Sequence, residues 1–298
     1  VDFWWMDWQQ GSNSLAEGYD HFADVLLVLD ERDENDAISL IKHYLIRKDA
    51  DFYGDSVSKL VSWLKESIVY PEADFLIGKV YQLEGEFKLA SSFYEKARRE
   101  ADFLDIPDVK FDILYAMADL ARQQGNTEDY EQMLLLVLAD DPNYQNKTLI
   151  RSFAKIIDAN TAENADRFFT LFRCSAKHSI PALYQLCHLS LARADSSAVF
   201  TCSALGMLEA FTHMLESLEE RNTEYRFTTL ESYFQSLEAY PEFLDWAEEE
   251  HVWELFFLFA ECADRRGNHI FTQRLYQIMS ESLPVEYWRA QAANRLDR

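Results

Sequence analysis

The chain has 298 residues, with 28 basic and 52 acidic side chains and a net charge of −24. Apolar residues make up 48% of it, which is enough for a folded core and excludes a disordered chain. Eight glycines and six prolines are too few for the closely spaced turns of a β-sandwich. The acidity excludes the basic patch that binds nucleic acid and argues against an anionic membrane surface.

Composition also bears on membranes and on the cellular compartment. The longest uncharged run, residues 178–192, is shorter than the roughly 18–20 apolar residues of a spanning helix, so we expect no transmembrane segment. Four cysteines form no C-x-x-C pair, and we interpret them as reduced core thiols: Cys174, Cys187, Cys202 and Cys262. Reduced thiols favour a cytoplasmic location. Because the sequence begins at Val1, a periplasmic protein that has lost its leader is the alternative.

The first 14 residues form an aromatic segment followed by a Gly/Ser linker. Four aromatic residues lie within its first ten positions: Phe3, Trp4, Trp5 and Trp8. One interpretation is a short helix that caps the first helix pair. A second is a tethered aromatic ligand that docks into a groove of this chain or a neighbouring one, and a third is an unstructured tail.

From residue 15 onward, apolar residues recur with helical spacing, and no convincing strand pattern appears. Residues 206–221 and 225–240 each place apolar side chains on one helix face, while residues 131–139 are apolar all round, which predicts burial on two sides. Each proline follows a helix-length segment, where we expect it to end the helix: Pro71, Pro107, Pro142, Pro181, Pro241 and Pro284. These intervals predict an all-α fold of stacked helix pairs.

Residues 71–101 contain the clearest predicted helix pair. Gly78 and Ala90 are small, so the two helices can approach closely, and Gly85 lies where the chain must turn. Tyr81, Phe87, Tyr94 and Ala97 surround that contact in the pattern. Residues 111–142 and 253–284 repeat the arrangement around the turns Gly125-Asn126 and Gly267-Asn268.

This pattern of small, aromatic and turn residues resembles the tetratricopeptide repeat over about 71–142 and 253–298. The resemblance implies a right-handed α-solenoid of stacked antiparallel helix pairs. Its parts would be N-terminal helices at 15–70, two repeats at 71–142, degenerate repeats at 143–250, and a last repeat with a capping helix at 251–298. In the degenerate region the turn glycines are missing, for example at Asn160.

The resemblance also implies a concave face, formed by the first helix of each pair, that binds a partner segment. It places nine residues there: Phe75, Lys79, Gln82, Tyr115, Asp119, Arg122, Phe257, Glu261 and Asp264. Their aromatic and acidic character favours a partner with apolar or aromatic anchors and basic residues over a terminal carboxylate. Packing between helix pairs is the alternative role for each of them.

No residue is predicted to be catalytic, and no cofactor or metal is expected. Asp140-Asp141 runs directly into Pro142 and does not form the paired carboxylates of a terpene-synthase-like enzyme. Zinc ligands usually have tighter paired spacing than Cys174/His178 or Cys187/His188, and residues 248–251 fit a solvated helix face. We therefore expect a non-catalytic scaffold or adaptor. The alternative is a solenoid that holds a small apolar ligand, as a transport-associated or lipid-handling component.

Overall fold

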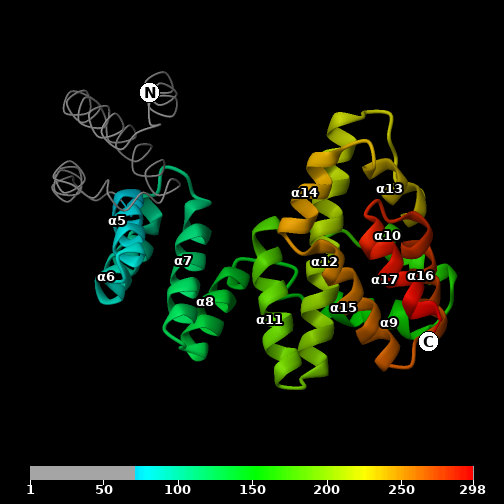
Figure 1. The fold of residues 1–298 in the computed structure, drawn as a ribbon, viewed down its shortest axis with the longest axis horizontal. Coiled ribbons are helices and arrows are strands. Elements are labelled where there is room, and N and C mark those ends of the chain that lie inside the picture. The colour runs from blue at the N-terminus through cyan, green and yellow to red at the C-terminus, as the bar shows by residue number, and fades with distance from the viewer. Residues whose placement is uncertain (1–70, 298) are drawn as a thin grey trace. The chain divides into compact units, whose positions relative to one another are not determined.

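The computed structural model describes residues 71–297, which form thirteen α-helices, two short 3-10 helices and no strand (Figure 1). This confirms the all-α prediction for that part of the chain. The predicted aromatic segment at 1–14 and the predicted helices at 15–70 lie outside the described residues. The chain divides into two compact units, residues 1–133 and 134–298.

The first unit contains three complete α-helices among its described residues, and a fourth crosses into the second unit. Their bounds are α5 (Pro71–Leu83), α6 (Phe87–Arg99), α7 (Val109–Gln123) and α8 (Thr127–Ala139), with the 3-10 helix η2 (Ala101–Phe103) after α6. The second unit contains nine further α-helices and the 3-10 helix η3 (Lys177–Ser179). These are α9 (Lys147–Asp158), α10 (Glu163–Leu171), α11 (Ile180–Ala192), α12 (Ser196–Arg221), α13 (Leu230–Leu237), α14 (Pro241–Glu249), α15 (Val252–Arg265), α16 (His269–Ser282) and α17 (Glu286–Leu296).

Helices α5 and α6 pack closely because Gly78 has no side chain. A Cβ at Gly78 would lie 2.6 Å from the ring of Tyr94 and 3.3 Å from the carbonyl oxygen of Ala90. Both Ala90 and Tyr94 are fully buried. The predicted contact between the small residues of this pair is therefore confirmed, and any larger residue at position 78 would force the helices apart.

Four helix pairs share one turn geometry. Each has a residue in the left-handed region, with φ of 79° at Gly85, 72° at Gly125, 56° at Ala194 and 91° at Gly267. The next residue donates its backbone N–H to the carbonyl five residues earlier, as in a Schellman motif: Glu86 to Tyr81, Asn126 to Ala121, Asp195 to Ser190 and Asn268 to Ala263. The three predicted turn glycines are confirmed. Asn160, where the sequence predicts a turn without glycine, also has a positive φ of 50°.

The core of the second unit is built around α12. Its predicted apolar face, Leu208, Phe211, Leu215 and Leu218, is buried. A Cβ at Gly206 would lie within 3.3 Å of side chains from both α11 and α15, so α12 touches each of them. Among the described helices, α12 is long and apolar enough to cross a membrane, but 83% of its apolar stretch is buried inside the protein, as in an ordinary core helix.

Three details of the predicted helices are wrong. The helix expected at 225–240 starts only at Leu230, because the side chain of Thr229 caps it by accepting from the backbone N–H of Ser232. The stretch 131–139 is buried on one side rather than two, since Leu134, Val137 and Leu138 are buried and Leu135 is 41% exposed. Pro181 and Pro241 lie at the beginning of helices rather than after them, because the first turn leaves the proline nitrogen unpaired anyway.

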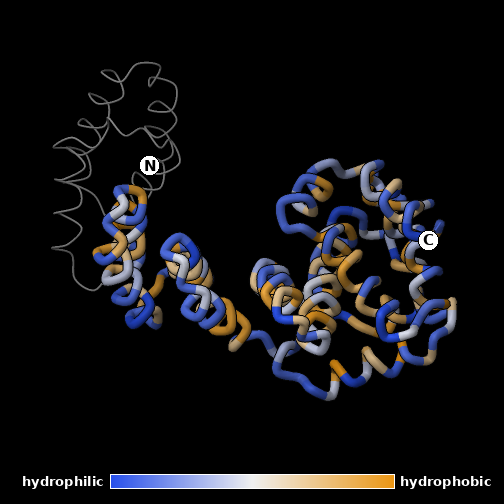
Figure 2. Tube along the Cα trace, turned by 60° about the horizontal axis from the view of Figure 1, so that its bottom comes forward, coloured by the Kyte–Doolittle hydropathy of each residue, from blue (hydrophilic) through white to orange (hydrophobic). Residues whose placement is uncertain are grey.

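The four cysteines are free and buried, as predicted. Burial raises the pKa of Cys202 to about 12, so its thiol stays protonated at neutral pH. Along most of the described helices, hydrophobic and hydrophilic residues alternate (Figure 2), as expected for amphipathic helices.

Candidate partner-binding faces

The nine predicted face residues occupy equivalent positions relative to the turn. They lie ten, six and three residues before Gly85 (Phe75, Lys79, Gln82), Gly125 (Tyr115, Asp119, Arg122) and Gly267 (Phe257, Glu261, Asp264). We call these three positions of a first helix its first-helix face. The residue seven positions before the turn is small and buried in each pair: Gly78, Ala118 and Ala260.

In the first unit, the face residues of α5 and α7 form one polar network. Gln82 donates to Asp119 Oδ2 at 3.0 Å, and the Arg122 guanidinium contacts Asp119 Oδ1 at 2.5 Å. Gln82 also accepts a hydrogen bond of 2.6 Å from the hydroxyl of Tyr94 on α6. Gln123 adds a third donor to Asp119 at 2.7 Å. The network joins Gln82 of one helix pair to Asp119 of the next, while the Arg122 side chain remains 65% exposed.

The remaining predicted residues of the first unit divide between the core and the surface. Phe75 is only 4% exposed, and its ring centroid lies 5.9 Å from that of Tyr94. The ring therefore packs inside the helix pair, which is the alternative role given for the face residues, and it is not exposed to a partner. Lys79 places its ammonium 4.9 Å from the Phe75 ring, and Tyr115 is half-buried on α7.

Phe257 on α15 also packs in the core, the alternative role given for the face residues. It is 7% exposed, and its ring packs against Tyr276 at 5.8 Å and Trp288 at 5.3 Å between centroids. Trp288 belongs to α17, the predicted capping helix, which covers this position. The spacing of residues within α15 does not show that α17, two helices further along the chain, covers this position.

Glu261 and Asp264 line a pocket of about 430 Å³ between α15, α16 and α17. Glu261 forms an ion pair with Arg295 of α17 and lies 3.8 Å from the Arg265 guanidinium. Asp264 contacts His269 Nδ1 at 2.7 Å. Carboxylates and cations therefore alternate around this pocket, and most of its lining is polar.

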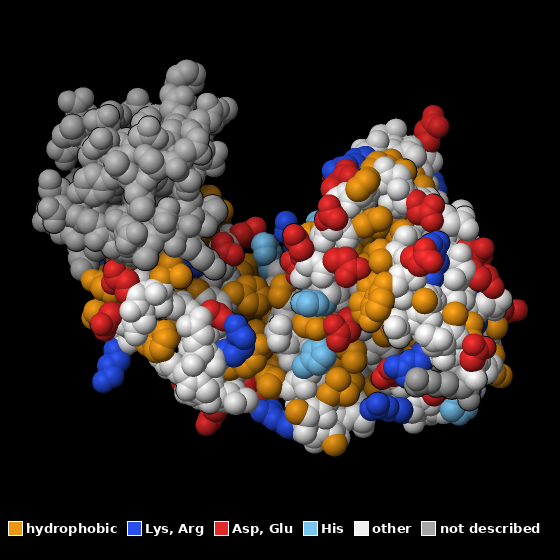
Figure 3. Space-filling view, viewed as in Figure 1, with side chains coloured by type: hydrophobic (Ala, Val, Ile, Leu, Met, Phe, Trp, Pro, Cys, Tyr) orange, Lys and Arg blue, Asp and Glu red, His pale blue; other side chains and the backbone are white. Residues whose placement is uncertain are grey.

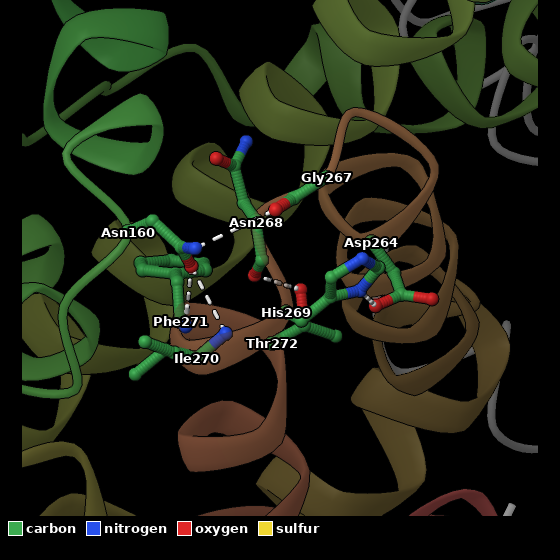
Figure 4. A network of polar contacts seen from close by, with 8 residues as sticks. All are labelled: Asn160, Asp264, Gly267, Asn268, His269, Ile270, Phe271 and Thr272. Carbon is green, nitrogen blue, oxygen red and sulfur yellow. Dashed lines mark hydrogen bonds and ion pairs between the residues drawn. The ribbon is translucent and has the colours of Figure 1, made fainter.

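The turn between α15 and α16 lies beside this pocket. It is held by residues at and just after the end of α9, before α10 begins (Figure 4). Asn160 Oδ1 accepts from the backbone N–H groups of Ile270 at 2.9 Å and Phe271 at 3.2 Å, and so caps the start of α16. Asp158 accepts from Arg266 at 2.9 Å and from Asn268 at 2.9 Å. These contacts fix the end of α15, where Asp264 lies, and the start of α16, where His269 lies. The two side chains are next to each other in Figure 4.

A fourth first-helix face lies on α11, and the sequence analysis missed it. Counting back from the turn residue Ala194 by ten, six and three gives Tyr184, His188 and Leu191, and the buried Cys187 occupies the small position. The turn carries Ala194-Asp195 where the other pairs have Gly followed by Glu or Asn. A search for a small residue followed by Asp, Glu or Asn would have found it.

The α11 face contacts α15 through an aromatic and acidic cluster. The Tyr184 hydroxyl donates to Glu254 at 2.7 Å, and the Tyr184 ring stacks on His251 with centroids 4.2 Å apart. His188 Nε2 lies 3.4 Å from the same carboxylate. Histidine and acidic side chains lie together over these helices (Figure 3). Beyond this cluster, Leu191 lines a pocket of about 260 Å³ together with Val199, Leu258 and Cys262.

Of the residues considered for metal binding, Cys187 and Glu248 make other contacts. Within residues 71–297, no group of three or more His, Cys, Asp and Glu side chains is arranged to hold a metal ion. The thiol of Cys187 points at the carbonyl of Val199, 3.8 Å away. In the acidic run before α15, Glu248 accepts from the Trp288 indole at 2.9 Å.

Comparison with known proteins gives one informative relative. A protein of Treponema pallidum (strain Nichols), described as an uncharacterized protein, is 30% identical over 279 residues, which cover 92% of this chain and 74% of the relative. The chain belongs to the same family as this protein. No family description and no solved structure matches the chain. The functional argument therefore rests on the geometry of the faces.

Proposed function

We propose that the helix pairs are tetratricopeptide-like repeats and that the protein is a non-catalytic scaffold or adaptor. The observation that carries this proposal is the recurrence of one unit. Four turns share a left-handed residue and the same hydrogen bond, and each follows a first helix with a small buried residue seven positions earlier. The resemblance implies that such units stack into a right-handed solenoid, with the first helices of each compact unit lining a binding face.

The partner that suits these faces is a protein segment with apolar anchors and basic residues. The faces present half-buried aromatic and aliphatic side chains beside fixed carboxylates, such as Tyr115 beside Asp119 and Leu191 beside Glu261. The net charge of −24 steers a basic partner toward the chain. The four buried, unpaired thiols support a cytoplasmic location for the complex.

The two pockets described above give no support to a small apolar ligand. The pocket with the more apolar lining has a volume of about 260 Å³, and the larger one, of about 430 Å³, has a mostly polar lining. Small-molecule sites are mostly apolar clefts of about 300–1,000 Å³. Neither pocket meets both conditions.

Affinity capture from a lysate of the native host tests the proposal. We expect the full chain to retain a specific protein, and the double variant Tyr115→Ala/Arg122→Ala to weaken its binding by about 2 kcal/mol, because aromatic and Arg contacts dominate such interfaces. Affinity and melting temperature are measured together on each variant.

The matched control is Leu89→Ala/Arg98→Ala, which removes an exposed apolar side chain and an exposed Arg from the second helix, α6. We expect this control to bind like the parent. If no protein binds the full chain reproducibly, or if binding is lost equally from both double variants, the assignment of the first helices as the binding face is wrong.

A further inference from the structure

The connection between α6 and α7 exposes two large apolar side chains. Phe103 is 67% exposed, more than any other large apolar side chain among the described residues, and Ile106 is 57% exposed. The two lie three residues apart in a connection of nine residues, 100–108. Exposed apolar side chains that occur together on a surface mark sites of interaction, whereas single ones are ordinary. We call residues 102–108 the α6–α7 loop.

The α6–α7 loop is anchored between its two exposed side chains. Leu104 is buried and packs into the core of the first unit. The backbone N–H of Asp105 donates to the buried carboxylate of Glu72 on α5 at 2.7 Å. Phe103 and Ile106 lie on either side of these two anchored residues, so the fold presents them from a fixed support. Little conformational entropy is then lost when the loop binds, which favours affinity.

The charge around these apolar side chains is locally acidic. Residues 100–108 contain four acidic side chains and no basic one. Three of the four are exposed: Asp102, Asp105 and Asp108. The basic residues that flank this stretch are in contact with other groups. Arg99 Nε donates to the carbonyl oxygen of Glu95 at 3.2 Å, and the Lys110 ammonium lies 4.8 Å from the centroid of the Phe111 ring. The loop therefore presents apolar side chains surrounded by negative charge.

We propose that the α6–α7 loop inserts into an apolar pocket of a protein partner whose rim carries Lys or Arg. Phe103 and Ile106 are the anchors, because large apolar side chains that fill a pocket supply most of the affinity of an interface. The exposed carboxylates meet the basic rim, which gives specificity and faster association. This surface is separate from the first-helix faces, so the inference goes beyond the proposed function and its test is independent of it.

Photo-crosslinking in the native host identifies the partner and its binding site. A benzophenone amino acid replaces Phe103 in the full chain, and mass spectrometry maps the crosslinked residues. We expect one protein, joined at an apolar pocket that has Lys or Arg on its rim. The matched control carries the same group at Leu89, which is 44% exposed on α6 and follows Lys88 directly. A crosslink to a second copy of the chain, a mapped site without basic residues, or no crosslink beyond the control would overturn the inference.

Affinities between the purified proteins then test the anchor and the charge separately. Phe103→Ala should weaken binding at least about tenfold and leave the melting temperature unchanged, because the ring is exposed. Asp102→Asn should weaken binding about two- to fivefold, as for an exposed charge pair, and reduce the loss of affinity on adding salt. Tyr115→Ala/Arg122→Ala should leave this affinity unchanged. A Phe103→Ala variant that binds like the parent, or that melts at a lower temperature because its own chain covers the ring, would overturn the inference.

Discussion

At the scale of single residues, Glu209 is an acidic side chain with no exposed surface. It lies on α12 and is buried in the second unit, with Asp141 and Asn143 nearby. Burial raises the pKa of its carboxyl well above the usual value, and the neighbouring Asp141 carboxylate raises it further. Glu209 therefore stays protonated in the folded protein at pH values where it is ionised in the unfolded chain.

This difference makes stability depend on pH. Below the pKa of a Glu side chain in the unfolded protein, about 4.3, Glu209 is neutral in both states. Its ionisation then does not change the free energy of unfolding. As the pH rises from there towards the higher folded pKa, the unfolded state loses its proton first, so the free energy of unfolding falls. We expect Glu209→Gln, which mimics the neutral form, to raise the melting temperature at pH 7 and to change it little at pH 4.

Melting curves of parent and variant at both pH values measure this effect. Glu220→Gln, an exposed position on the same helix, is the control and should show no such pH dependence. A Glu209→Gln variant that is equally stabilised or destabilised at both pH values would show that packing, not ionisation, decides the contribution of this residue.

At the scale of elements, the turn between the two helices of a pair is the feature that sequence reasoning predicts best. Gly85, Gly125 and Gly267 were found because glycine is the residue that adopts positive φ without strain. The pair α11–α12 was missed for the same reason, since Ala194 adopts that conformation with a Cβ. The close packing of α11 against α12 goes with that turn, because the small residues Cys187 and Gly206 let the two helices approach closely.

The exposure of side chains was harder to predict than the helices. Spacing places Phe75 and Phe257 on the first-helix face, yet Tyr94 and Trp288 cover them. Which neighbour covers a face depends on contacts between distant segments, and a local pattern does not contain them. Gln82, Asp119 and Arg122 contact one another near the surface, and their role in partner binding stays a prediction.

The turn geometry predicts opposite effects for two substitutions. Ala194→Gly should stabilise the protein by up to about 1 kcal/mol, because the left-handed conformation costs Ala about 1–2 kcal/mol and glycine loses more chain entropy on folding. Gly267→Ala should destabilise it by about 1 kcal/mol. A Cβ at Gly267 would meet no atom within 4 Å, so only the backbone conformation changes.

Urea unfolding of both variants and of the double variant measures these free energies. The sites are in different turns, so we expect the two effects to add. A destabilised Ala194→Gly variant would mean that the Ala194 methyl group contributes more through packing than its conformation costs.

At the scale of the whole molecule, the main electrostatic property is an excess of negative charge. The 52 acidic side chains exceed the basic ones by 24. Ion pairs such as Arg98–Glu95 and Arg122–Asp119 join partly exposed groups, and pairs of this kind contribute at most about 1 kcal/mol each. These weak ion pairs do not offset the acidic excess. The carboxylates therefore repel one another more strongly in the folded chain than in the extended one.

Salt should consequently stabilise this protein. Raising the ionic strength from 0.01 M to 0.1 M shortens the screening length from about 30 Å to about 10 Å. That change screens repulsion between distant carboxylates more than attraction within close pairs. We expect the melting temperature at pH 7 to rise by about 2–4 °C, which corresponds to about 1 kcal/mol for a chain of this size. Near the isoelectric point, about pH 4.6, the net charge vanishes and so should the effect. A melting temperature that falls with salt at pH 7 would show that close ion pairs outweigh the repulsion, and that the excess negative charge is dispersed widely enough to cost the fold little.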